Sequence, residues 1–72
     1  MTIKLTQLPA GQGMLLTPPE GFEALSLPER SVDEGLEILG LIIPWHLGGP
    51  LLVDVSEQDY RLLTIKVQEG EL

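Results

Sequence analysis

The sequence predicts an α+β fold in one small domain, residues 1–72, with a mostly antiparallel sheet of four to five short strands and one short helix. Three observations support this prediction. Short apolar segments with period-two alternation are separated by turns that contain glycine and proline, as in antiparallel sheets. One segment, about residues 32–39, has apolar residues at helical spacing. The chain is long enough for a single small core.

Two strands are expected at the start of the chain. From Thr2 to Leu8, apolar Ile3 and Leu5 alternate with polar residues, which is typical of a strand with one face in solvent. Residues 9–13, Pro-Ala-Gly-Gln-Gly, predict a turn, because proline lacks the backbone donor and glycine accepts a positive φ. Residues 14–17 then return as a second short strand.

Residues 18–30 are expected to form an irregular loop, because three prolines and a glycine interrupt any regular pattern. Phe22 favours a loop that packs on the domain, since a solvated loop seldom contains an aromatic side chain. The alternative is an arm that becomes ordered on a partner.

The clearest local signal predicts a helix over residues 32–39. Ser31 and Glu34 have the spacing of a capping box, in which each side chain bonds a free backbone N–H at the helix start. Gly40 is typical of the position that follows a helix end. Gly35 lies inside the helix and costs up to about 1 kcal/mol relative to alanine. The apolar stripe of this helix consists of Val32, Leu36 and Leu39.

The second half of the sequence predicts two further strands that form a hairpin. Leu51–Val55 and Tyr60–Val67 are rich in strand-forming residues, and a short polar loop separates them. Residues 41–43 are a brief strand or an extended link that ends at Pro44. Residues 68–72 are expected to be a frayed tail.

The composition favours association with another protein. Leucine, isoleucine and valine make up 24 of the 72 residues, and leucine alone accounts for 15. A chain of this length buries about 60% of the surface that its unfolded form exposes. Part of this aliphatic surface is therefore expected to stay exposed, and exposed apolar patches usually mark contact sites. The alternative is that all the leucines pack inside one tight core.

Charge and composition also exclude several classes of function. Acidic residues outnumber basic ones by 11 to 4, a formal net charge of −7, so we expect no nucleic-acid partner. The absence of cysteine excludes disulfides, thiolate metal sites and a cysteine nucleophile. The most apolar stretch, residues 38–52, is interrupted by glycine and proline and is too short to cross a bilayer, so we expect no membrane insertion and a cytoplasmic protein.

His46 is the one side chain that titrates near neutral pH in an ordinary environment. A minor metal-binding or catalytic domain centred on His46, with Asp54, Glu57 or Asp59, is therefore an alternative function. A zinc site needs three or four ligands, and no nucleophile motif surrounds the serines. We expect a turn histidine in a protein that is not an enzyme and uses no metal or other cofactor.

The favoured function is a non-enzymatic protein–protein interaction module, acting as a small subunit, adaptor or inhibitor. Tryptophan is enriched at interface hot spots, and Pro44 would hold Trp45 on a rigid loop. Alternatively, Trp45 covers the open end of a small core. We expect an apolar patch ringed by acidic residues that binds a protein partner or a second copy. A further alternative is an acidic charge mimic that blocks a nucleic-acid-binding protein. The expected interaction residues are Trp45, His46, Leu47, Ile42, Ile43 and Phe22.

Three short motifs carry a family resemblance. Residues 36–41 are Leu-Glu-Ile-Leu-Gly-Leu, residues 47–51 are Leu-Gly-Gly-Pro-Leu, and residues 60–63 are Tyr-Arg-Leu-Leu. Together they resemble the small SH3-like accessory proteins of bacterial ferrous-iron transport, in which a helix ending in Leu-Gly-Leu precedes a Leu-Gly-Asp-Pro turn and a final hairpin. In that family a whole strand separates the first two motifs, whereas here residues 42–46 do. The resemblance implies a partly open SH3-like barrel and, as an alternative function, a role of that transport type.

Overall fold

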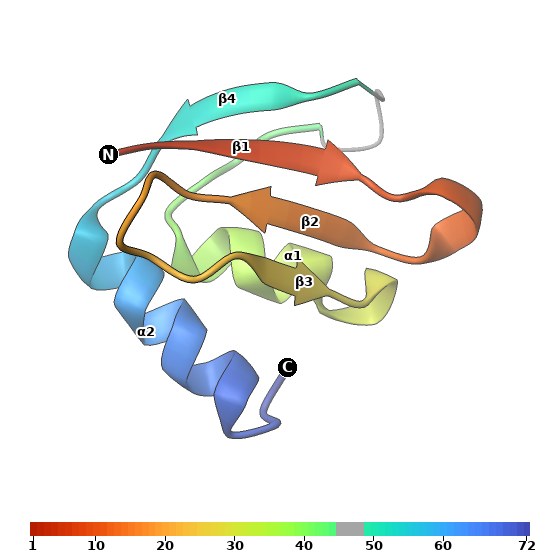
Figure 1. Ribbon diagram of the computed structural model, residues 1–72. Coiled ribbons are helices and arrows are strands. Elements are labelled where there is room, and N and C mark those ends of the chain that lie inside the picture. Colours follow the sequence, from red (N-terminus) through yellow and green to blue (C-terminus); the bar gives the residue numbers. More distant parts are fainter. Residues whose placement is uncertain (45–48) are drawn as a thin grey trace.

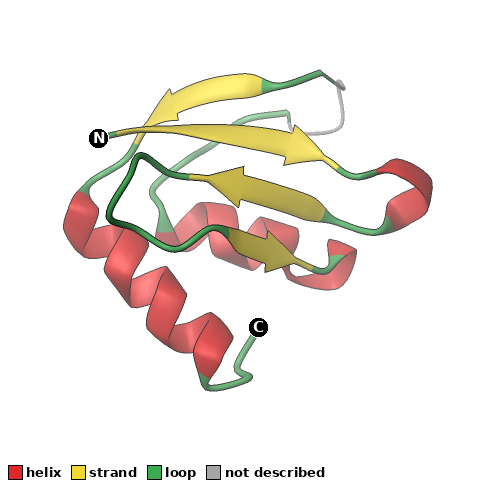
Figure 2. Cartoon of the chain, in the orientation of Figure 1, coloured by secondary structure: helices red, strands yellow, loops and turns green. Residues whose placement is uncertain are grey.

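The computed structural model describes residues 1–44 and 49–72 and confirms the α+β class. In these residues a four-stranded antiparallel sheet is combined with two α-helices and a short 3-10 turn (Figures 1 and 2). No helix in this part of the chain is long and apolar enough to cross a membrane. The elements are β1 (Thr2–Gln7), η1 (Pro9–Gly11), β2 (Met14–Thr17), β3 (Leu25–Leu27), α1 (Glu29–Ile38), β4 (Leu51–Asp54) and α2 (Glu57–Gln68).

The sheet has the strand order β3-β2-β1-β4 and is open, so it does not close into the barrel that the family resemblance implies. β1 lies inside the sheet and pairs with β2, the next strand along the chain, and with β4, which follows α1 in the sequence. Leu5 lies opposite Leu16 of β2 on one side and Leu51 of β4 on the other. β3 and β4 are therefore the two edges of the sheet.

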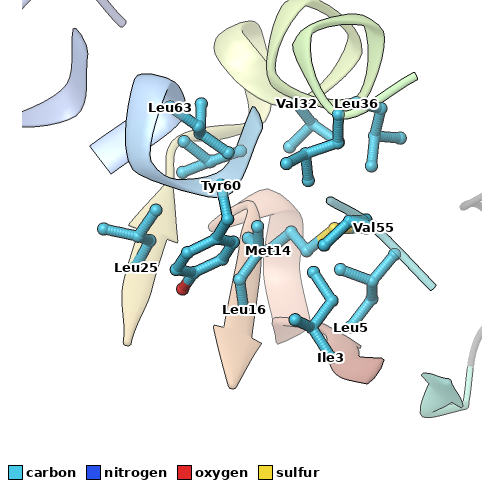
Figure 3. Close-up of a cluster of buried hydrophobic side chains, with 12 residues drawn as sticks. Ile3, Leu5, Met14, Leu16, Leu25, Val32, Leu36, Val55, Tyr60 and Leu63 are labelled. Atoms are coloured by element: carbon cyan, nitrogen blue, oxygen red, sulfur yellow. The ribbon is translucent and has the colours of Figure 1, made fainter. Parts of the chain in front are cut away.

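Both helices cover the same face of the sheet, so the domain has two layers (Figure 1). The core lies between these layers, where α1 and α2 present apolar side chains to alternate residues of the strands (Figure 3). The predicted stripe of α1 is confirmed, because all three of its residues are buried. The buried apolar residues are Ile3, Leu5, Met14, Leu16, Leu25, Leu27, Val32, Leu36, Leu39, Val55, Tyr60 and Leu63.

The prediction of a strand at Tyr60–Val67 is wrong, because this segment lies in α2. Ser56 is the N-cap, and its Oγ accepts a hydrogen bond of 3.0 Å from the backbone N–H of Asp59. Tyr60 and Leu63, three positions apart, are fully buried on the side of the helix that faces the core. Residues with high strand propensity are thus held in a helix by capping and packing. The predicted hairpin is also wrong, since β4 pairs with β1.

Helix α1 starts earlier than predicted. It begins at Glu29, with Pro28 at the N-cap, and Ser31 lies inside the first turn. The backbone N–H of Ser31 donates a 2.9 Å hydrogen bond to the carbonyl of Pro28, so the predicted capping box at Ser31 is wrong. Pro28 has an extended backbone with φ −64°, which lets a helix begin directly after it without a side-chain cap.

Gly35 allows α1 to pack closely against the sheet. A Cβ atom at this position would lie 2.4 Å from Cδ1 of Leu27 in β3 and 3.7 Å from Cδ1 of Leu63 in α2. The Leu27 side chain would then have to move, whereas the distance to Leu63 is an ordinary van der Waals contact. The glycine that weakens the isolated helix is therefore the residue that brings α1, α2 and β3 together.

Both helices end in the same way. Gly40 has φ +73°, as predicted for a residue after a helix end, and the next N–H, of Leu41, donates to the carbonyl of Leu36 at 2.9 Å. Gly70, with φ +75°, follows α2 in an equivalent arrangement. Residues 68–72, expected to fray, thus contain a hydrogen-bonded helix ending.

Residues 18–30 are less irregular than predicted. β3 occupies Leu25–Leu27 and pairs with β2, and the first helical residue, Glu29, follows soon after. Leu25 and Leu27 are buried and Ser26 between them is exposed, which is the alternation of a strand with one wet face. Three residues are too few for this alternation to stand out in the sequence.

Candidate interaction surface

The structure describes three of the six predicted interaction residues. Ile42 is 101% exposed, and Ile43 beside it is half-buried and packs against the core. Residues 41–43 form a link without strand structure, which settles the alternative left open by the sequence. The other three predicted residues lie outside the described part of the chain: Trp45, His46 and Leu47.

A shallow hollow of about 520 Å³ lies between α1 and the link that follows it. Its apolar lining comes from Leu36, Leu41 and the neighbouring isoleucines of the link. Asp33 and Glu37, one helical turn apart on α1, line the same hollow. Apolar and acidic side chains therefore meet at this place on the surface.

Phe22 lies at a different site. Its ring packs edge-on against Tyr60, with 6.1 Å between ring centroids, and the guanidinium of Arg61 lies 4.9 Å from the Phe22 centroid. Phe22 and Arg61 also line a second hollow, of about 280 Å³, that shares no residue with the first. The structure therefore does not bring Phe22 together with Ile42.

Several large apolar side chains are exposed, as the composition predicts. Two of them, Leu51 and Leu52, are neighbours in β4, and Leu52 is the more exposed of the pair at 69%. In Figure 1, β4 is the upper edge of the sheet, and no helix or strand of the described chain lies beyond it. In the part of the chain that the structure describes, the exposed large apolar residues are Ile42, Leu51, Leu52, Leu62 and Ile65.

The hydrogen bonds between β1 and β4 determine which backbone groups of β4 face outward. Met1 and Val55 exchange two bonds, of 2.7 and 2.8 Å, so this pair is a hydrogen-bonded pair of the antiparallel ladder. The pairs then alternate along the register, which makes Val53 a residue bonded to β1. Leu52 and Asp54 consequently direct their N–H and C=O groups away from β1, toward the open edge.

The side chains of Leu52 and Asp54 lie on the sheet face that the helices leave open. The register places Leu52 opposite Lys4, and Lys4 opposite Thr17 of β2. Asp54 lies opposite Thr2, whose hydroxyl donates a 2.8 Å hydrogen bond to a carboxylate oxygen of Asp54. The exposed Leu52 thus lies beside Lys4 of β1 and two residues before Asp54 on the same face.

Metal binding finds no support in the described residues, where no group of three or more histidine, aspartate or glutamate side chains could hold an ion. His46, the centre of the alternative catalytic or metal-binding site, lies outside them.

No family model, curated protein or solved structure matches this chain. The segment Tyr-Arg-Leu-Leu at 60–63, which supports the SH3-like resemblance as part of a final hairpin, is helical. The function is therefore inferred from the shape, charge and exposed residues of the described surface.

The exposed edge at Leu52 is absent from the predicted interaction residues. The sequence predicts the strand, but it pairs this strand with the wrong partner. With β4 in a hairpin, the edge would have been covered by residues 60–67. The apolar pair Leu51–Leu52 after Pro50 is the signal in the sequence, and it becomes informative once the strand order is known.

Proposed function

We propose that the protein is a non-enzymatic interaction module of the cytoplasm, a small subunit, adaptor or inhibitor, whose contact surface is the β4 edge. The observation that carries this proposal is an edge strand with outward-facing backbone groups at Leu52 and Asp54 and with an exposed leucine on its open face. Partners bind such edges by adding a strand, in which main-chain hydrogen bonds give affinity and side chains give specificity.

The edge has only some of the features that usually prevent strand addition, since β4 is short and ends in the charged Asp54. Natural edge strands are protected by lysine, by proline, by bulges or by a covering element. The residues Leu51–Asp54 contain neither lysine nor proline, and their register with β1 continues without a bulge. Asp54 supplies a charge at one end of the strand. An apolar edge strand without lysine, proline or a bulge in a small acidic protein favours a surface that is used for binding.

The acidic character has a separate role in this proposal. A net charge of −7 keeps a protein with an exposed apolar edge in solution. It also steers encounters, since long-range charge affects the rate of association more than its affinity.

The experiment that tests this function compares the wild type with Leu52→Lys and with the control Thr17→Lys. Both variants add a lysine to the same open face, but Thr17 lies in β2, away from the edge. Each protein is immobilised and exposed to host lysate, and its molar mass is measured by light scattering. The proposal predicts a protein partner, or a second copy, that Thr17→Lys retains and Leu52→Lys loses. A wild-type monomer that captures nothing beyond what Leu52→Lys captures overturns it.

A further inference from the structure

We infer that the occupant of the β4 edge is a second copy of this chain, paired antiparallel through Leu52 and Asp54 so that two sheets join into one of eight strands. This inference rests on the proposed function and names the partner. A strand that pairs antiparallel with its own copy does so about a two-fold axis, which closes the assembly at a dimer.

Backbone geometry selects one register for this dimer. Leu52 and Asp54 are the residues of β4 whose N–H and C=O groups both point outward. When Leu52 lies opposite Asp54 of the partner subunit, both copies use all of these groups, and four main-chain hydrogen bonds form. Shifting the register by two residues in one direction places Leu52 against itself and Asp54 against Pro50, which has no N–H to donate. Shifting it in the other direction places Asp54 against itself, where the two carboxylates repel one another.

The chosen register also matches the side chains. Val53 lies on the two-fold axis and meets the partner's Val53 in a non-hydrogen-bonded pair, where cross-strand side chains approach most closely. Val53 is half-buried and packs against the core, so the new contact extends the existing core. On the open face, Leu52 and the partner's Leu52 are diagonal neighbours, within reach of long side chains.

Charge complementarity supports a second copy over an arbitrary apolar strand. In this register Lys4, Leu52 and the partner's Asp54 lie in one row across the sheet. Lys4 and the partner's Asp54 are two strands apart, about 10 Å between Cα atoms, which an extended lysine and an aspartate can span. The two-fold axis creates this pairing twice. Each Asp54 meets a base of the other copy and no carboxylate.

The net charge gives the dimer a characteristic response to salt. Two copies that each carry a charge of −7 repel one another at long range, and salt screens this repulsion. Raising the ionic strength should therefore strengthen self-association. Binding of a basic partner would respond in the opposite way, because salt screens attraction between opposite charges.

The first test uses light scattering over a concentration series of the whole chain, in low and in high salt. The expected result is a molar mass that rises with concentration from 7.9 kDa toward twice that value, at lower concentration in high salt. Leu52→Pro removes an outward N–H while leaving the bonds between β1 and β4 intact, and proline is tolerated on the open side of an edge strand. Leu52→Val keeps the N–H and is the matched control. The proline variant should stay monomeric and the valine variant should dimerise.

The second test identifies the register through charge reversal at two exposed positions. Lys4→Glu alone and Asp54→Lys alone should each weaken the dimer, and the double variant should restore it. Rescue supports the proposed row. If the wild type dimerises without rescue, or if Leu52→Pro still dimerises, the proposed interface is wrong. If the wild type remains monomeric at every concentration, a second copy is not the occupant, while a lysate partner that Leu52→Lys loses would still support the interaction module.

Discussion

The hydroxyl of Tyr60 donates a hydrogen bond of 2.5 Å to the backbone carbonyl of Glu23 and so ties α2 to the loop that precedes β3. Tyr60 is completely buried, and its ring packs edge-on against Phe22 of the same loop. A second bond joins the same elements, because the side-chain amide of Gln68 donates to a carboxylate oxygen of Glu23 at 2.7 Å. The loop between β2 and β3 is thus fixed by the helix that sequence patterns did not predict.

The ionisation of Tyr60 should be shifted to high pH. Burial, and to a lesser extent the negative charge of Glu23, raise the pKa of Tyr60 from 10.0 to about 12. The pKa of Tyr60 is higher in the folded than in the unfolded chain. The neutral hydroxyl therefore stabilises the folded state fully below pH 10, and this stabilisation is lost as the pH rises toward 12. Tyr60 is the one tyrosine, so absorbance of tyrosinate near 295 nm should titrate close to pH 12 in the folded protein and near 10 in denaturant.

Tyr60→Phe isolates the contribution of the Tyr60 hydroxyl from that of the other side chains. The stability difference between wild type and Tyr60→Phe should shrink above pH 10, by on the order of 2 kcal/mol in total, when measured by denaturant unfolding. A native titration midpoint near pH 10 would contradict the burial of the hydroxyl.

Gly35→Ala should destabilise the protein although alanine is the better helix former. The added methyl would meet Cδ1 of Leu27 at 2.4 Å, and overpacking of this kind costs about 1–3 kcal/mol. Glu34→Ala, one residue earlier on the exposed side of α1, is the control and should be nearly neutral. Urea unfolding of both variants measures the difference, and an increase in stability for Gly35→Ala would refute the close approach of α1 to β3.

Ser56→Ala should cost about 1 kcal/mol, because the Asp59 N–H loses the Oγ acceptor at the start of α2. Ser26→Ala is a matched control, since this serine is exposed in β3. Thermal unfolding followed by circular dichroism compares the two. Equal stability of both variants would mean that Ser56 does not cap a helix.

The helical periodicity of α2 predicts which of two adjacent leucines matters for stability. Leu63→Ala should destabilise by about 2–5 kcal/mol because Leu63 is fully buried, and Leu62→Ala should cost less than about 1 kcal/mol because Leu62 is 46% exposed. In a strand, by contrast, Leu62 would share the face of buried Tyr60. A large loss at Leu62 and a small one at Leu63 would therefore argue for the strand.

Elements whose cause is local could be predicted from the sequence. β1 follows from the alternation around Ile3 and Leu5, and the end of α1 follows from Gly40. The apolar stripe of α1 was also predicted. The first residue of the helix was not, because Pro28 and Ser31 are both possible N-caps, and Pro28 needs no side-chain hydrogen bond to start a helix.

Elements decided by distant contacts could not be predicted in this way. Tyr60–Val67 has strand-forming residues and becomes a helix because Tyr60 and Leu63 complete a core built by β1, β2 and α1. The same error concealed the interaction surface, since a strand placed beside β4 would have covered Leu52. Strand order, unlike alternation, depends on the whole chain.

The place of β1 in the sheet has a consequence for how the chain is made. β1 and its first neighbour, β2, are synthesised in immediate succession. The second neighbour, β4, comes much later, since Asp54, the partner of Thr2, lies 52 positions further along the chain. At about 5–20 residues per second, the far side of β1 stays unpaired for seconds on the ribosome. Closing so long a loop is the slow part of folding in small domains. A nascent chain that has not yet reached Asp54 therefore leaves one side of β1 without its strand partner.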